Sequence, residues 1–129
     1  MIDPDFPEEL RAFIRDNIPD VDAAELLLKL AREPDRRYDL HTLLADLAPT
    51  AISEPVARKH LALFQERGLV VSTQANTYHY SPSTLELDAA VHALTRVYNA
   101  RPVTMVRMIY ALRDEKIRSF ADAFRIKKT

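Results

Sequence analysis

A single glycine divides the middle of this chain. Gly68 stands where a helical pattern over residues 53–67 stops and an apolar run of residues 69–71 begins, in the stretch ARKHLALFQERGLVV. Glycine adopts a left-handed backbone conformation at no steric cost, and many helices end on such a residue. The chain is therefore expected to turn at Gly68 from a helix directly into a strand.

Prolines and capping residues mark the other boundaries, because the chain has eight prolines and no second glycine. The predicted helix N-caps have side chains that accept a backbone hydrogen bond: Asp22, Asp39, Ser53 and Ser83. The expected helices occupy residues 5–18, 22–33, 40–48, 53–67, 84–100 and 102–124. A short strand at 37–39 and a hairpin over 69–81 complete the predicted elements.

This order of elements predicts the fold class: mainly α with a small β-hairpin. Two helices joined by a turn and followed by a hairpin form the winged helix-turn-helix arrangement, here with extra N- and C-terminal helices. The predicted division is an N-terminal helix in residues 1–20, the winged helix-turn-helix core in 21–82, and C-terminal helices in 83–129.

The helix over residues 53–67 separates into two faces at 100° per residue. Ala57, Leu61 and Phe64 fall on one side together with His60, which we interpret as structural. Pro55, Lys59, Ala62 and Glu66 fall on the opposite side, with Arg58 at its edge, so this side has short and basic side chains near the start of the helix. A helix that enters the major groove needs this division, with one face packed on the protein and the other offered to base edges.

The stretch RKHLALFQERGLVV also resembles the core signature of bacterial winged-helix regulators of the ArsR and MarR type. The matching positions are His60-Leu61, Phe64 and Gly68-Leu69-Val70, and the resemblance covers roughly residues 22–81. The order of elements is closer to the MarR layout. The resemblance implies DNA binding, with Arg58 and Lys59 as the groove-facing residues.

The predicted DNA contacts lie in and before this helix: Thr50, Ser53, Pro55, Arg58, Lys59 and Ala62. Hydroxyl groups at a helix N-terminus suit phosphate, whereas Arg58 and Lys59 are suited to guanine or phosphate. Arg36 and Arg37 are predicted contacts to the DNA backbone, since the hairpin segment STQANTYHY has no lysine or arginine.

Charge is distributed unevenly, although the formal net charge is only -1. Residues 1–35 have ten acids and four bases, whereas residues 81–129 have nine bases and five acids. The hairpin without a base and the net charge leave open a second hypothesis, a protein-interaction adaptor that has the fold and does not bind DNA.

The helix over residues 102–124 begins with the largely apolar segment PVTMVRMIYAL. Such a segment needs burial on two sides, against helix 84–100 and against a further surface. We therefore expect a homodimer through residues 84–124, whose paired helices would meet two DNA half-sites.

Other functions lack their residues. The four histidines form no metal-ligand spacing, there is no cysteine, and one glycine is too few for phosphate-binding loops. We expect no enzyme activity, no cofactor and no metal, and the residues identify no small-molecule effector. The absence of an apolar membrane-spanning run and of a signal-peptide pattern predicts a cytoplasmic protein with no membrane partner.

Overall fold

The computed structural model describes residues 7–47, 51–74 and 77–127, with side chains in the last helix described as far as Asp122. The elements in chain order are α1 (Glu8–Asn17), α2 (Val21–Arg32), β1 (Tyr38–Asp39), α3 (Leu40–Asp46), α4 (Glu54–Glu66), β2 (Val70–Gln74), β3 (Thr77–Tyr80), α5 (Leu85–Ala100) and α6 (Pro102–Lys127). The chain is thus mainly helical with a small antiparallel sheet, which confirms the predicted fold class at this level.

The sheet has the strand order β1-β3-β2. Tyr38 on β1 pairs with Tyr78 on β3, and Val70 on β2 pairs with Tyr80. A register shift interrupts the β2–β3 ladder between Ser72 and Gln74. Both the short strand and the hairpin were predicted at these places. The finding that the sequence did not predict is that β1 joins the hairpin to form a third strand.

Two of the four predicted N-caps are confirmed. Asp39 accepts a hydrogen bond from the backbone N–H of Thr42 (2.8 Å), and Ser53 accepts one from Val56 (3.4 Å).

The caps predicted at Asp22 and Ser83 are wrong, because neighbouring residues fill those positions. Asp20 is the N-cap of α2 and accepts a hydrogen bond from the backbone N–H of Ala23 (2.9 Å), so Asp22 lies inside the first turn. Thr84 is the N-cap of α5. The backbone N–H of Ser83 donates to the carbonyl of Gly68 (2.7 Å), so Ser83 belongs to the preceding turn.

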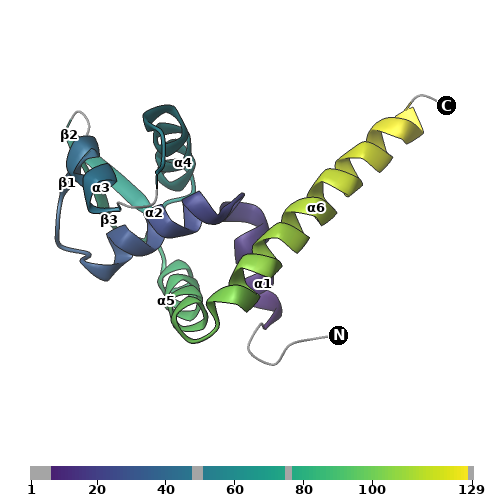
Figure 1. Cartoon of the computed structure of the whole chain (residues 1–129), viewed down its shortest axis with the longest axis horizontal. Coiled ribbons are helices and arrows are strands. Elements are labelled where there is room, and N and C mark those ends of the chain that lie inside the picture. Colours follow the sequence, from purple (N-terminus) through teal and green to yellow (C-terminus); the bar gives the residue numbers. More distant parts are fainter. Residues whose placement is uncertain (1–6, 48–50, 75–76, 128–129) are drawn as a thin grey trace.

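Helix α2 runs through the centre of the fold (Figure 1). Its apolar side chains Leu26, Leu27 and Leu30 are fully buried, and it contacts α4, β3 and α5. Elements from the middle and from the C-terminal half of the chain therefore pack against α2, and the position of α4 depends on this contact.

Gly68 has a φ of 76°, as predicted. Its N–H donates to the carbonyl of Gln65 (3.2 Å), and the N–H of Leu69 donates to Phe64 (2.9 Å), which is the hydrogen-bond pattern of a Schellman motif. A Cβ at this position would lie 2.4 Å from Oγ of Ser83. Both the backbone conformation and the close approach therefore favour glycine.

Helix α6 differs along its length. In its first half, Met105, Ile109 and Leu112 are buried, and the helix contacts α1 and α5. In its second half, every side chain from Arg113 to Asp122 is exposed, and the helix projects away from the rest of the molecule (Figure 1). Within the described ranges, no helix combines the length and the apolar character needed to cross a membrane.

Candidate nucleic-acid interface

Helix α4 begins as the sequence predicted, with Ser53 at the N-cap and Pro55 in the first turn. Proline is tolerated there because the first N–H groups of a helix have no acceptor within it. The segment before this helix includes Thr50, a predicted DNA contact that lies outside the described residues.

The two faces of α4 are separated by burial. Ala57, His60, Leu61 and Phe64 are buried, and the helix contacts α2. The predicted contact residues of this helix share its exposed face: Pro55, Arg58, Lys59 and Ala62. Ser53, directly before the helix, is also exposed. Except for Thr50, the candidate contacts near α4 are thus brought to one accessible surface.

Arg58 is engaged in an ion pair one helical turn away. Its Nη2 and Nε atoms donate to Oε1 of Glu54 at 2.9 Å and 3.1 Å. Both side chains are about half exposed, so water screens this pair and its contribution to stability is small. A DNA contact by Arg58 would have to break the pair or share its guanidinium with Glu54.

Lys59 is the next residue on the same face, and it is exposed. Among the described residues, no carboxylate lies within ion-pair distance of its ammonium group. Its charge is therefore available to an external anion. Of the two predicted groove-facing bases, Lys59 can contact DNA without breaking an ion pair such as the one between Arg58 and Glu54.

An open cleft of about 470 Å³ lies between the first turns of α3 and α4. Its charged lining includes Asp39, Glu54 and Arg58. The pKa of Asp39 is held below its usual range, first by the backbone N–H of Thr42 and then by the Thr42 hydroxyl. The cleft thus has two carboxylates beside one guanidinium, so it is not a built anion site.

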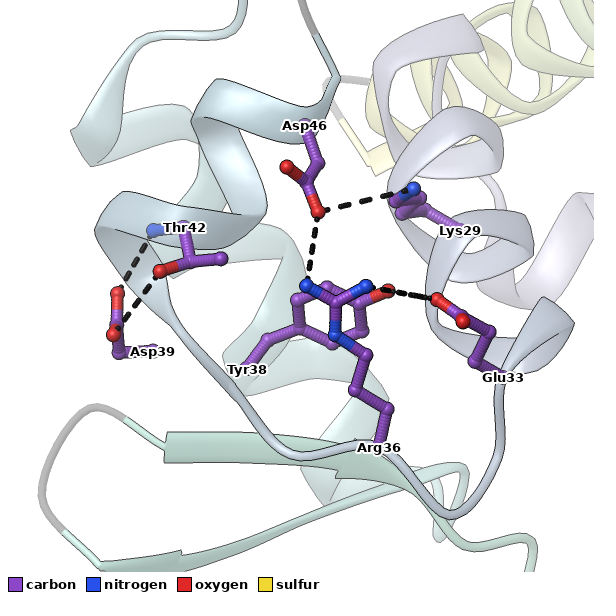
Figure 2. Close-up of polar contacts among 7 residues, drawn as sticks. All are labelled: Lys29, Glu33, Arg36, Tyr38, Asp39, Thr42 and Asp46. Atoms are coloured by element: carbon purple, nitrogen blue, oxygen red, sulfur yellow. Dashed lines mark hydrogen bonds and ion pairs between the residues drawn. The ribbon is translucent and has the colours of Figure 1, made fainter.

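Arg36 belongs to a cluster of polar contacts within the protein (Figure 2). Its guanidinium pairs with Glu33 at 3.1 Å and with Asp46 at 3.4 Å, and it lies 4.3 Å from the centre of the Tyr38 ring. These contacts join the end of α2, the start of β1 and the end of α3. They favour a structural role for Arg36 over the predicted backbone contact.

The ionisation of the cluster fits this arrangement. The Tyr38 hydroxyl donates to Glu33 (2.7 Å), and this bond, followed by the Arg36 contact, lowers the pKa of Glu33. Burial and the same bond raise the pKa of Tyr38. Glu33 is therefore held as a carboxylate and Tyr38 as a neutral phenol, each in the state that the hydrogen bond requires.

Arg37 lies on the sheet, next to the position where Tyr38 pairs with Tyr78. Its Nη1 donates to Oγ1 of Thr73 on β2 (3.3 Å) and lies 3.2 Å from Nδ1 of His79 on β3. A positive charge therefore reaches across the hairpin that lacks its own lysine or arginine. This placement supports Arg37, rather than Arg36, as the candidate for a DNA backbone contact.

His60 is 4% exposed and anchors α4 from its inner side. Its Nε2 lies 3.1 Å from Oδ1 of Asp20, at ion-pair distance but without hydrogen-bond alignment. The same oxygen accepts the Ala23 N–H that caps α2. The buried position agrees with the structural interpretation of His60, and the contact joins α4 to the start of α2.

Comparisons with known protein families, with curated proteins and with solved structures gave no significant match. The ArsR and MarR resemblance therefore stays a prediction. Within the described residues, no group of three or more histidine, aspartate or glutamate side chains is placed to hold a metal ion.

Sequence reasoning missed two features of this surface. Glu54 stands four residues before Arg58, a spacing that is typical of helical ion pairs and therefore readable in advance. The contact of Arg37 with Thr73 and His79 has no such local signal, because it depends on β1 pairing with a hairpin that follows some forty residues later in the chain.

Proposed function

We propose that the protein is a sequence-specific DNA-binding transcriptional regulator that acts as a homodimer. In this proposal residues 21–82 form a winged helix-turn-helix core, α4 enters the major groove, and the β2–β3 hairpin is the wing. No catalytic step, cofactor or metal is part of the proposal.

One observation carries the proposal: α4 has a buried face that fixes it on α2 and an opposite face whose N-terminal half has small side chains and two bases, with Glu54 paired to one of them. The side chains of Pro55 and Ala62 are short, which permits a close approach of the helix to base edges. Arg58 and Lys59 supply donors for guanine or for phosphate. Arg37 supplies a cation on the wing sheet that the hairpin itself lacks.

The homodimer is proposed because one recognition helix contacts only a short stretch of DNA. A single helix reads only a few base pairs, whereas a two-fold pair reads two half-sites about one helical turn of DNA apart. The exposed apolar side chains of α6 provide a surface on which two copies can meet.

The test begins with selection of bound fragments from random duplex DNA, followed by titrations of the selected fragment at several salt concentrations. We expect Arg58→Ala with Lys59→Ala to lose about 2–6 kcal/mol of binding free energy, at about 1–3 kcal/mol per base-contacting side chain. The matched control is Arg96→Ala with Arg107→Ala, which removes the same charge from exposed positions on α5 and α6. Equal losses in both variants would reduce the interaction to net charge and contradict the proposal.

A substitution that increases affinity makes the test sharper. Glu54→Gln removes the carboxylate that pairs with Arg58, and it also removes a negative charge from the face offered to DNA. We expect several-fold tighter binding of the selected fragment. Unchanged or weaker binding would show that Arg58 does not reach the DNA.

The adaptor alternative has its own supporting observation, the exposed large side chains Val103, Tyr110, Ile117 and Phe120 on α6. A protein partner would cover such side chains, whereas DNA would not. If no fragment is selected even at low salt, the adaptor becomes the better account.

A further inference from the structure

The exposed apolar side chains of α6 form one line along the helix. Val103, Tyr110 and Ile117 are spaced seven residues apart and are 63%, 47% and 56% exposed. Phe120, three residues after Ile117, is 70% exposed. Residues seven and three apart lie on the same side of a helix, so these side chains share one face. Glu115 and Ser119 lie on the opposite side of the projecting half.

The face continues from a cleft at the corner between α1 and α2. This cleft has a volume of about 380 Å³, and Ile18 and Pro19 from the corner meet Arg113, Lys116 and Ile117 from α6 there. It lies where α6 leaves the body of the protein, just beyond the buried Leu112. The surface that packs inside the monomer thus extends onto the projecting half of the helix.

The projecting half is long for a helix in which every described side chain from Arg113 onward is exposed. Isolated helices shorter than about 12–15 residues are marginal in water, and most helical stability in proteins comes from packing of an apolar face. Side chains as large as Ile117 and Phe120 are also unfavourable in a contiguous exposed patch. These properties favour a partner that covers this face.

Charge indicates that the partner is a second copy. Residues 113–128 have six bases and three acids, whereas residues 1–35 have ten acids and four bases. Glu8 and Glu9, in the first turn of α1, are exposed. Arg113 and Lys116 share a cleft with Asp20 of their own chain, but the end of α6 points away from that chain (Figure 1), so the acids of a second copy can complement the bases at this end.

We propose that the projecting halves of α6 from two copies pair antiparallel, with Ile117 and Phe120 next to the two-fold axis. A parallel pair would bring both basic ends together and both bodies to the same end. An antiparallel pair instead places each basic end beside the acidic N-terminal region of the other copy. This inference rests on the homodimer of the proposed function and specifies its interface, but it does not require that the dimer bind DNA.

The chain has no cysteine, so single introduced cysteines report this geometry directly. The probes are Ile117→Cys and Phe120→Cys, and the matched controls are Glu115→Cys and Ser119→Cys on the opposite side. Each variant is oxidised at micromolar concentration, in native buffer and in denaturant, and dimers are separated without reductant. A disulfide needs Cα atoms about 4.4–6.8 Å apart, so only residues close to the axis are expected to form one.

Tyr110→Cys distinguishes the two orientations. In an antiparallel pair centred between Ile117 and Phe120, the two copies of residue 110 lie about 26 Å apart along the helix axis, from a rise of about 1.5 Å per residue, whereas the copies of 117 and of 120 lie only about 4.5 Å apart along it. The two copies of residue 110 would be adjacent in a parallel pair. We expect efficient cross-linking at 117 and 120, and none above the denatured background at 110, 115 and 119. Cross-linking at 110 as efficient as at 117, equal cross-linking at all five positions, or none at any of them would overturn the proposal.

Molar mass in solution gives a second, independent readout. Ile117→Glu with Phe120→Glu changes only exposed positions, so the helical circular dichroism of the monomer is expected to persist while the mass falls from dimer to monomer. A wild-type chain that is monomeric at the same concentrations would overturn the pairing even if it bound DNA. A dimer that binds no DNA would instead leave the pairing intact and contradict the proposed function.

Discussion

Helices α4 and α6 are both amphipathic, but they use their exposed surfaces differently. Helix α4, of 13 residues, packs on α2 along its buried face and exposes small and charged groups. Helix α6, of 26 residues, has its buried side chains in its first half and exposes large apolar groups along its length. The comparison teaches that α4 is held by a buried face within one chain, whereas every described side chain in the second half of α6 is exposed.

The largest expected effect sharpens this comparison with one substitution made in both helices. Phe64 on α4 is fully buried, whereas Phe120 on α6 is 70% exposed. We expect Phe64→Ala to cost about 3–5 kcal/mol of unfolding free energy, because it leaves a cavity in the core. At protein concentrations low enough to keep the chain monomeric, Phe120→Ala is expected to stay within about 0.5 kcal/mol, as surface substitutions usually do.

Urea denaturation followed by circular dichroism measures both variants, at two protein concentrations. If the second half of α6 pairs with another copy, the cost of Phe120→Ala should rise with protein concentration, whereas that of Phe64→Ala should not. Similar costs in both helices at low concentration would break the comparison, since they would mean that Phe120 already contributes to the monomer core.

The next effect concerns the turn that ends α4. Gly68→Ala places a side chain at a φ of 76° and within 2.4 Å of Oγ of Ser83. We expect a loss of about 2–3 kcal/mol, of which the left-handed backbone accounts for about 1–2 kcal/mol. Adding Ser83→Ala should recover part of the remainder, because it removes the overlapping oxygen. A double-mutant cycle by urea denaturation measures this coupling, and strictly additive costs would contradict the close approach.

A smaller effect tests the connection between the two regions. The Tyr98 hydroxyl on α5 donates to Glu25 on α2, and so links the helices that support α6 to the helix that supports α4. We expect Tyr98→Phe to cost about 1 kcal/mol, which is typical of one hydrogen bond. The measurement is again urea denaturation, with the exposed Tyr110→Phe as the matched control, which should change stability little.

The same bond gives a dependence on pH. Burial, followed by the bond to Glu25, raises the pKa of Tyr98 above the value of about 10 for an unfolded tyrosine. Its stabilisation is therefore complete below pH 10 and is lost as the pH rises above that value. The difference between wild type and Tyr98→Phe should shrink over this range. A constant difference up to pH 11 would show that the phenol is not held neutral by the fold.

The sequence predicted the parts of this molecule that depend on local pattern. The two faces of α4 follow from the periodicity of its apolar residues. The left-handed turn at Gly68 follows from the change there from a helical to an extended pattern. The caps at Asp22 and Ser83 were wrong by one or two residues, because several consecutive side chains can accept the same backbone bond. Whether Asp20 or Asp22 caps α2 depends on where the chain turns after Pro19.

The parts that depend on distant segments were not predictable. Arg36 and Arg37 are adjacent and chemically identical, so the same role was predicted for both. The structure places Arg36 among Glu33, Asp46 and Tyr38, and Arg37 on the sheet beside Thr73 and His79. Only the pairing of β1 with β3 separates the two side chains, and no local pattern in the sequence encodes that pairing.

The smallest expected effect lies in the cluster around Arg36, at the opposite end of α2 from its contact with α4 through Asp20. The bond from Tyr38 and the contact with Arg36 lower the pKa of Glu33, so its stabilisation is present above the ordinary glutamate pKa and is lost as the pH falls through the folded value. Because Glu33 is exposed, the effect is strongly screened. We expect Glu33→Gln to lower the urea midpoint slightly at pH 7 and not at pH 3, with the exposed Glu86→Gln unchanged at both. If Glu33→Gln lowered the urea midpoint as much as Tyr98→Phe does, the cluster around Arg36 would contribute as much to stability as the α2–α5 contact, and this ranking of the two would be wrong.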